Sequence, residues 1–240
     1  MPTRGLGNNS GPWRYLAGGS LAVAITTVFM MRRHPASLLV STGDAAALGK
    51  LWNSATEFML SVPPESEHVV LVPREQAKGK TVKKIPQYFA SHVVFALTAF
   101  DPPGQSRSLE VNTRENGRLF QKLSELRSEG RVTAIWPAFG VHVIEKWRED
   151  GFCVAFSRSD AAAGRSAIMA IATSFGQGAV YEYTAATSSL DREWELLRHT
   201  VPAVSGPEVA GTEKMVRVET GPPIEGTALD RPWAGPEGWH

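Results

Sequence analysis

The sequence predicts an α+β fold of ferredoxin-like βαββαβ topology, a four-stranded antiparallel sheet with two helices on one face. The main observation is that residues 93–184 run in the order strand, helix, strand, strand, helix, strand. Residues 15–31 carry no charge, which predicts an N-terminal single transmembrane helix. Residues 201–240 are rich in Pro and Gly, which predicts an extended C-terminal arm.

Composition excludes several classes of protein. The chain has 240 residues and is 42% hydrophobic, which is enough for a packed core. Its 25 basic and 24 acidic residues nearly cancel, so no overall field attracts nucleic acid. The single cysteine, Cys153, excludes an internal disulfide and cysteine-based zinc or iron–sulphur sites. The six histidines are scattered, so we predict no metal site, no cofactor and no catalytic residue.

The uncharged residues 15–31 predict a membrane anchor. A helix of this length spans roughly 26 Å, close to the hydrocarbon thickness of a bilayer. Trp13 precedes it, and Arg14 and Arg32 flank it, as is typical of membrane interfaces. A cleaved signal peptide and a mitochondrial presequence are the alternatives. The side chains expected in lipid are those of Tyr15, Leu16, Val23, Ile25, Val28 and Phe29.

Residues 36–87 predict an amphipathic helix, a short strand and a basic linker. Asp44 is a suitable N-cap, and apolar residues recur at helical spacing over about 45–60. HVVLVP at 68–73 reads as a strand, and 74–84 reads as a solvated basic loop. The glycine that a phosphate-binding loop needs before Gly79 is absent.

The central part of the chain, 88–185, is expected to form the α+β domain. Its predicted elements are strand 93–100, helix 109–128, strand 131–136 with a possible continuation at 141–147, strand 151–157, a helix after Asp160, and strand 178–184.

Beyond this domain we expect the chain to have little regular secondary structure. Residues 188–199 predict a short helix, and the arm that follows carries Trp233 and Trp239, which need a surface to bury against. The predicted organisation is therefore a membrane anchor at 1–35, the helix, strand and linker at 36–87, the α+β domain at 88–185, and a short helix with an extended arm at 186–240.

Four polar residues are candidates for a ligand pocket. Asn112 and Asn116 share a helix face with buried leucines, Asp101 follows the first strand, and Gln177 lies between Gly176 and Gly178 before the last strand. Buried amides need hydrogen-bond partners. The cluster of Asp101, Asn112, Asn116 and Gln177 is either a small polar pocket or a hydrogen-bond network that holds the loops in place.

Several motifs resemble a widespread bacterial family, domain of unknown function 3293. They are TAFDPPG at 98–104, the asparagine-marked helix, Trp147-x-Glu149, and FGQGAVY at 175–181. The resemblance covers about residues 88–184 and implies the fold and a small domain, with no known activity. The chain departs from the family pattern at Phe100, Asp101, Gly151 and Gly178, where the family tends to have Trp, Asn, Ser and Asn.

Together these features predict a non-catalytic accessory subunit of an organellar membrane complex. Its partners would be the other subunits and the lipid bilayer, and not nucleic acid. A respiratory complex of the mitochondrial inner membrane is favoured, with a photosynthetic complex of the thylakoid as a second possibility. The alternative is a membrane-tethered ligand-binding or enzymatic domain that uses the four-residue polar pocket.

Overall fold

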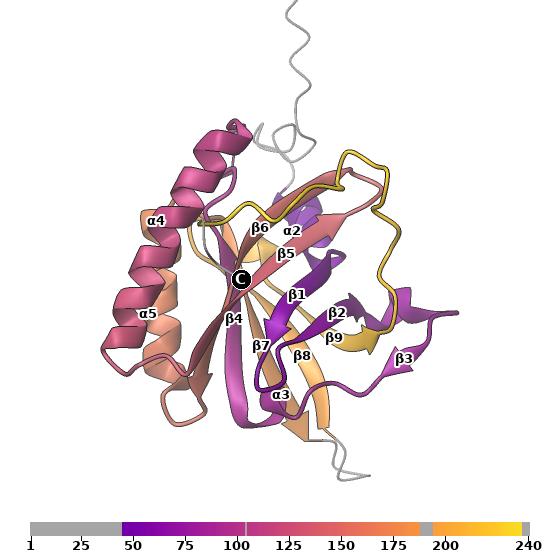
Figure 1. The fold of residues 1–240 in the computed structure, drawn as a ribbon, viewed down its shortest axis with the longest axis horizontal. Helices are drawn as coiled ribbons and strands as arrows, with labels where there is room; N and C mark the ends of the chain where they lie inside the picture. Colours follow the sequence, from indigo (N-terminus) through magenta and orange to yellow (C-terminus); the bar gives the residue numbers. More distant parts are fainter. Residues whose placement is uncertain (1–44, 104, 188–193, 237–240) are drawn as a thin grey trace, which may run out of the picture. The chain divides into compact units, whose positions relative to one another are not determined.

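The computed structural model describes residues 45–103, 105–187 and 194–236 (Figure 1). The strands are β1 (Thr56–Val62), β2 (Glu67–Pro73), β3 (Val82–Lys83), β4 (His92–Thr98), β5 (Ala134–His142), β6 (Trp147–Ser157), β7 (Ala179–Thr187), β8 (Trp194–Pro202) and β9 (Gly211–Val218). The α-helices are α2 (Ala45–Asn53), α3 (Tyr88–Ser91), α4 (Leu109–Ser128) and α5 (Ala161–Ser174), and Arg74–Ala77 and Pro207–Val209 form the 3-10 turns η1 and η2.

Eight of these strands form a closed antiparallel barrel. Their order is β2-β1-β5-β6-β4-β7-β8-β9, and β9 pairs back onto β2 with Val218 opposite Val70. Strand β3 adds to the end of β9. The predicted fold class is therefore wrong, because the sheet does not stop at four strands.

The closure has a clear physical cause in strand β4. Its side chains at 93, 95 and 97 join the core beneath the helices, whereas Val94 and Ala96 join a second core on the opposite face. A sheet that is apolar on both faces must be covered on both. The helices cover one face, and the strands between Thr56 and Pro73 and between Trp194 and Val218 enclose the other by closing the barrel.

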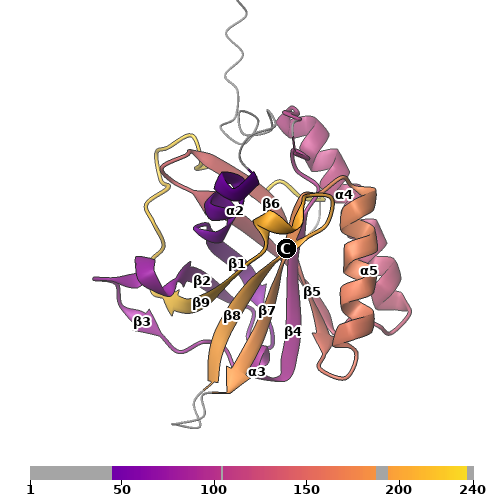
Figure 2. The ribbon, with the colours of Figure 1, turned by 180° about the vertical axis from the view of Figure 1, so that it is seen from behind.

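Helices α4 and α5 lie side by side on the outside of the barrel in both views (Figures 1 and 2). Helix α4 begins and ends where the sequence predicts, and the Ser108 hydroxyl accepts a hydrogen bond from the Val111 amide at its N-terminus (3.3 Å). Its buried Leu119 and Leu123 pack with Ile168 of α5 and with Phe95 of the sheet. The two helices thus support the strands that carry the site described below.

Two predicted helices are corrected by the structure. The helix expected over 45–60 ends at Asn53, and Thr56–Val62 is strand β1. The short helix expected at 188–199 is wrong where it can be compared, because Trp194–Pro202 is strand β8 and 188–193 lie outside the described residues. Both strands contain a buried charged residue, Glu57 or Arg198, at an inward position. These charges hide the apolar alternation that predicts a strand.

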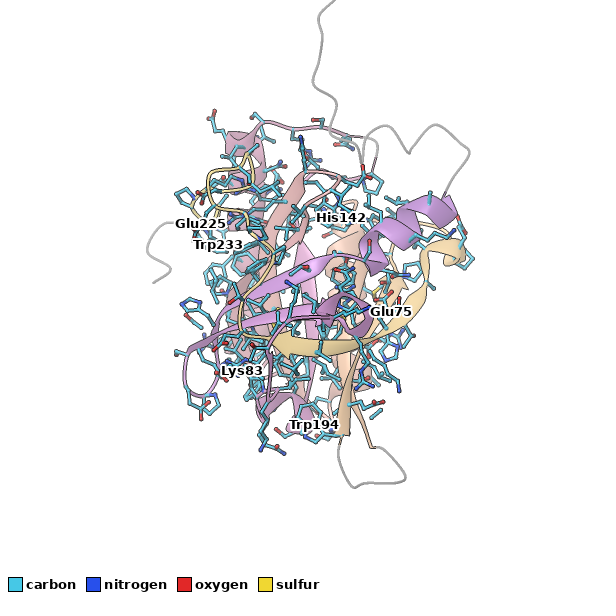
Figure 3. All side chains as sticks on the ribbon, turned by 90° about the vertical axis from the view of Figure 1, so that its right-hand side faces the viewer. Glu75, Lys83, His142, Trp194, Glu225 and Trp233 are labelled. Carbon is cyan, nitrogen blue, oxygen red and sulfur yellow. The ribbon has the colours of Figure 1, made fainter. Side chains whose placement is uncertain are left out.

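The C-terminal segment contributes a barrel strand and then packs on the outer surface of the barrel. Beyond β9, the Trp233 ring contacts Phe152 edge to face at 5.3 Å, and its Nε1 donates to the Ala138 carbonyl at 3.2 Å. Figure 3 shows Trp233 on the C-terminal segment, on the side of the barrel away from Glu75. Trp239 lies outside the described residues.

A buried ion cluster fastens this C-terminal segment to β6. Asp150 is fully buried, accepts from Arg148 Nε at 2.7 Å, and also pairs with Arg231 and with the Ala234 amide. Arg148 in turn donates to the carbonyls of Leu229 and Arg231. The segment is therefore held by charge-assisted hydrogen bonds as well as by apolar packing.

The predicted anchor, with Tyr15, Leu16, Val23, Ile25, Val28 and Phe29, lies outside the described residues. In the part of the chain that the structure describes, no helix has the length and apolar character needed to cross a membrane.

Candidate functional site

A cavity opens at the end of the barrel that adjoins α2. Its walls come from β1, β4, β5, β6 and β7, and from the loop after β4. Its volume of about 80 Å³ is several times what one water molecule needs. The polar lining residues are Glu57, Thr98, Asp101, Gln105, Glu149, Gln177 and Tyr181, and the aromatic ones include Trp52, Phe139 and Trp147.

Two carboxyl groups flank a gap in the cavity wall. Glu57 of β1 lies opposite Gly140 of β5, and Gly140 lies opposite Glu149 of β6. Residues directly opposite one another across strands point to the same face of a sheet, so both glutamates face the cavity. A Cβ at Gly140 would lie 3.6 Å from Glu57 Oε2 and 3.6 Å from Trp147 Cζ3. The missing side chain leaves room between two acids and an indole ring.

Burial controls the protonation of both acids. It raises the pKa of Glu57 to about 7, although the positive charge of Arg198 opposes this, with a smaller effect of the nearby Tyr183 hydroxyl in the same direction. The pKa of Glu149 rises to about 8, first through burial and then through the charges of Asp101, Glu57 and Asp150. Glu149 keeps some exposure to the cavity. Both groups can therefore change protonation near neutral pH.

Two buried polar atoms of the lining have no hydrogen-bond partner among the described protein atoms. They are Glu57 Oε2 and Trp147 Nε1, on side chains that are 3% and 4% exposed. The Tyr181 hydroxyl differs, because it donates to the Trp52 carbonyl at 2.7 Å. Buried polar groups in folded proteins are nearly always paired, so each exception needs an explanation.

Helix α2 covers this end of the barrel and is held there by Arg198. The fully buried guanidinium donates to the carbonyls of Asn53 at 2.6 Å and Ala55 at 2.8 Å, and pairs with Glu213 at 3.1 Å. A cation at a helix C-terminus also compensates the helix dipole. Trp52 of α2 lies over Gly178, where an added Cβ would come within 2.3 Å of the indole ring.

The structure places the four candidate pocket residues in two roles. Asp101 and Gln177 line the cavity. Asn112 lies behind it and donates to Asp101 Oδ1 at 3.0 Å. Asn116 is fully buried, accepts from the Ala99 amide at 2.9 Å and donates to the Asp150 carbonyl at 2.7 Å. The asparagines hold the chain after β4 in place and do not line the cavity.

Gln177 links two junctions of the fold. Gly176 takes a φ of +70° at the end of α5, a conformation that favours glycine, and the chain then turns into β7. The Gln177 side chain donates to the Phe100 carbonyl at 2.9 Å. It thereby joins the α5–β7 junction to the β4–α4 junction while also facing the cavity.

The lining residues that sequence reasoning missed include Glu57, Trp147, Glu149 and Tyr181. A signal existed for the Trp147 and Glu149 pair, because residues two apart on a strand share a face and the pair belongs to the family-like motif. Glu57 and Tyr181 carried no such signal, since only closure of the barrel brings β1 and β7 to one cavity. Across the described ranges, no three His, Cys, Asp or Glu side chains are grouped so that they could hold a metal ion.

The fold and cavity define a closed β-barrel domain with an acidic, aromatic-walled site at one end. Residues 97–180 of this chain match the family described as "Protein of unknown function (DUF3293)", which confirms the resemblance seen in the sequence. The match spans a little over a third of the chain and includes Thr98, Trp147, Glu149 and Gln177 of the cavity wall. No curated protein and no solved structure shows a significant match to the chain.

These findings overturn the predicted function. The prediction of a membrane-anchored accessory subunit depended on a spanning helix and on a core domain without a working site. The described chain instead holds a closed barrel with a polar end cavity, contains no helix suited to a membrane, and carries a segment of an uncharacterised family. The predictions about organellar location and about partner subunits remain untested.

Proposed function

We propose that this protein is a small-molecule-binding domain that takes a compact organic ligand into the cavity at the α2 end of the barrel. The observation that carries the proposal is the pair of unpartnered buried atoms, Glu57 Oε2 and Trp147 Nε1, on side chains that line one cavity. An acceptor and a donor of the described chain are thus left without a partner beside the cavity.

The energetics favour a ligand over a structural role for these atoms. A buried polar group without a partner costs about 1–3 kcal/mol. The hydroxyl of Tyr181 and the amide of Gln177 are paired close by. Among the described residues, the other unpaired buried atoms belong to Tyr88, Trp136 and Tyr183, which do not line this cavity. Apolar and aromatic walls with a few uncommitted polar groups are typical of small-molecule sites.

The position of the family segment supports the same conclusion. Thr98, Trp147 and Gln177 are far apart in the sequence, yet all line this cavity and all belong to motifs by which the chain resembles its family. A shared binding site would explain why these motifs converge in the fold.

A thermal-shift screen of the full chain against a metabolite collection tests this proposal. We expect at least one compound to raise the melting temperature in proportion to its occupancy. Gly140→Val, which fills the gap between the two glutamates, should abolish that rise. Gly117→Ala is the matched control, because an added Cβ at Gly117 has nothing within 4 Å. A hit that stabilises Gly140→Val as well as the wild type would place binding elsewhere and contradict the proposal.

A further inference from the structure

We propose that the ligand of this cavity carries a positively charged N–H group, an ammonium or guanidinium, which binds over Gly140 between Glu57 and Glu149. This inference rests on the proposed function and names the chemical class of its ligand.

The first argument is the geometry of the gap. Adjacent strands lie about 4.8 Å apart, so Glu57 and Glu149, two strand spacings apart across Gly140, have backbones about 10 Å from one another. A nitrogen that contacts two carboxylates at about 2.8 Å needs their oxygens about 4.5–5.5 Å apart. Glu57 reaches over Gly140 from one side, with Oε2 3.6 Å from the position of an added Cβ, and Glu149 lines the same cavity from the other side.

The second argument is the surroundings of the point where a Gly140 Cβ would lie. This point is 3.6 Å from Glu57 Oε2, 3.6 Å from Trp147 Cζ3 and 3.8 Å from Trp147 Cη2. A cationic group centred near it would contact a carboxylate oxygen and an indole ring together. Tryptophan is the aromatic side chain that attracts cations most strongly.

The third argument is the charge left unbalanced in the cavity wall. Glu57, Asp101 and Glu149 all line it. In the described part of the chain, neither glutamate forms an ion pair, and the Arg198 guanidinium is bonded to Glu213 and to backbone carbonyls. Asp101 Oδ1 accepts from the Arg107 amide and from Asn112. The wall therefore has acceptors for a cation, and its described lining includes no Lys, Arg or His side chain to pair with an anion.

Binding should be coupled to the release of protons. The acids have pKa values of about 7 and 8 in the empty cavity, and a cation between them favours their ionised forms. Glu57 is faced by Arg198 of β8 and by Tyr183 of β7, and Glu149 by Asp101 of the loop after β4. Cation affinity should consequently rise between pH 6 and pH 8.

The test uses four probes with the full chain, n-butylammonium, n-butylguanidinium, n-butanol and butyrate. Binding is followed by NMR through the indole Nε1–H signal of Trp147, which Trp147→Phe identifies. We expect n-butylammonium to shift this signal in a saturable manner, and n-butylguanidinium to do the same. Butanol and butyrate should bind at least tenfold more weakly.

Three variants identify the acids. Glu57→Gln and Glu149→Gln should each weaken n-butylammonium binding at least tenfold at pH 8. Glu182→Gln should not, because that buried carboxylate pairs with Arg165 and does not line this cavity. Folding of each variant is checked by its NMR dispersion.

The outcomes separate this inference from the proposed function. Saturable binding of butanol or butyrate at the Trp147 signal, with no preference for the cations, would overturn the inference and leave a small-molecule site in place. Cation binding that both glutamine variants retain would also overturn it. If neither these probes nor the metabolite collection binds the wild-type chain, both proposals fail.

Discussion

Glu57 and Glu149 face the inside of a barrel whose other inward side chains include Met59, Leu71, Trp136 and Ala138. Each acid interrupts an otherwise apolar row. An ionised carboxylate is costly at such a position unless it is paired, so the neutral form is favoured until a cation arrives. At the scale of single residues, the two glutamates therefore make the stability of the folded protein depend on pH.

The pH dependence of stability should reveal this link. Both acids have folded pKa values above the unfolded value of 4.5, so the folded state holds protons that the unfolded state has lost. Their contribution to stability is complete below about pH 4.5 and disappears as pH rises through 7 and 8. The loss approaches about 1.4 kcal/mol per pH unit for each acid.

Urea unfolding of the wild type and of Glu57→Gln/Glu149→Gln between pH 5 and pH 8.5 measures this effect. The difference between the two proteins isolates the acids, since His142 and other titrating groups are common to both. We expect the wild type to lose stability relative to the double variant as pH rises. A difference that does not change with pH would show that the acids are ionised throughout.

Arg198 should matter more than a surface arginine. Arg198→Leu leaves the carbonyls of Asn53 and Ala55 without their buried donor and Glu213 without its partner. We expect a loss of about 2–4 kcal/mol in the free energy of unfolding, together with faster amide exchange in α2. Arg114→Ala, at an exposed site on α4, should change stability by about 0.5 kcal/mol or less. Unchanged α2 exchange in Arg198→Leu would contradict the role given to this side chain.

At the scale of elements, the central helices and strands were predictable because their patterns are clear. Helix α4 has an N-cap serine, leucines at helical spacing and a glycine after its end, and its predicted bounds are correct. Strand β8 shows the opposite case. Its Trp194 and Leu197 lie at helical spacing with Leu190, whereas the actual inward row contains Trp194, Leu196 and Arg198. A short run with a charge on its buried face is ambiguous in sequence.

Helix α4 contains one replaceable glycine. Gly117 lies in the helix interior, and an added Cβ would meet nothing within 4 Å. Gly117→Ala should raise the free energy of unfolding by about 0.5–1 kcal/mol, because alanine loses less backbone entropy in a helix. Chemical denaturation measures the change. Destabilisation would mean that the helix is packed more tightly at this point than the structure shows.

The C-terminal segment should detach when its central acid loses its charge. Asp150→Asn leaves Arg148 and Arg231 without a buried anion, and we expect rapid chymotryptic cleavage after Trp233. Glu225→Gln is the control, because Glu225 is exposed on the same segment and lies outside the ion cluster. Equal cleavage rates in the two variants would mean that the ion cluster does not hold the segment.

At the scale of the whole molecule, sequence reasoning failed because barrel closure is a non-local property. No local sequence pattern predicts that β9 pairs with β2, which lies more than 130 residues earlier in the chain. The prediction of the candidate site was incomplete for the same reason. Asp101 and Gln177 lie next to recognisable helix ends, but the acids opposite them belong to β1 and β6, whose positions depend on the closed sheet.

Closure also predicts which fragments fold. Residues 88–187 contain the predicted α+β domain but lack β1, β2, β8 and β9, which leaves Trp136, Tyr183 and Cys153 of the barrel interior exposed. We expect this fragment to bind hydrophobic dyes and to give poorly dispersed NMR spectra. A fragment of residues 45–236 should unfold cooperatively. A well-dispersed spectrum from residues 88–187 would show that the four central strands are stable by themselves.

The contact between Trp52 and Gly178 has an evolutionary consequence. Glu149 and Gln177 belong to the segment shared with the family, but Trp52 and Glu57 precede it. A relative with asparagine at position 178 could not accommodate an indole ring there. If the proposed site is common to the family, sequence changes before residue 97 would alter the wall formed by Trp52 and Glu57, while the wall formed by Glu149 and Gln177 stayed the same.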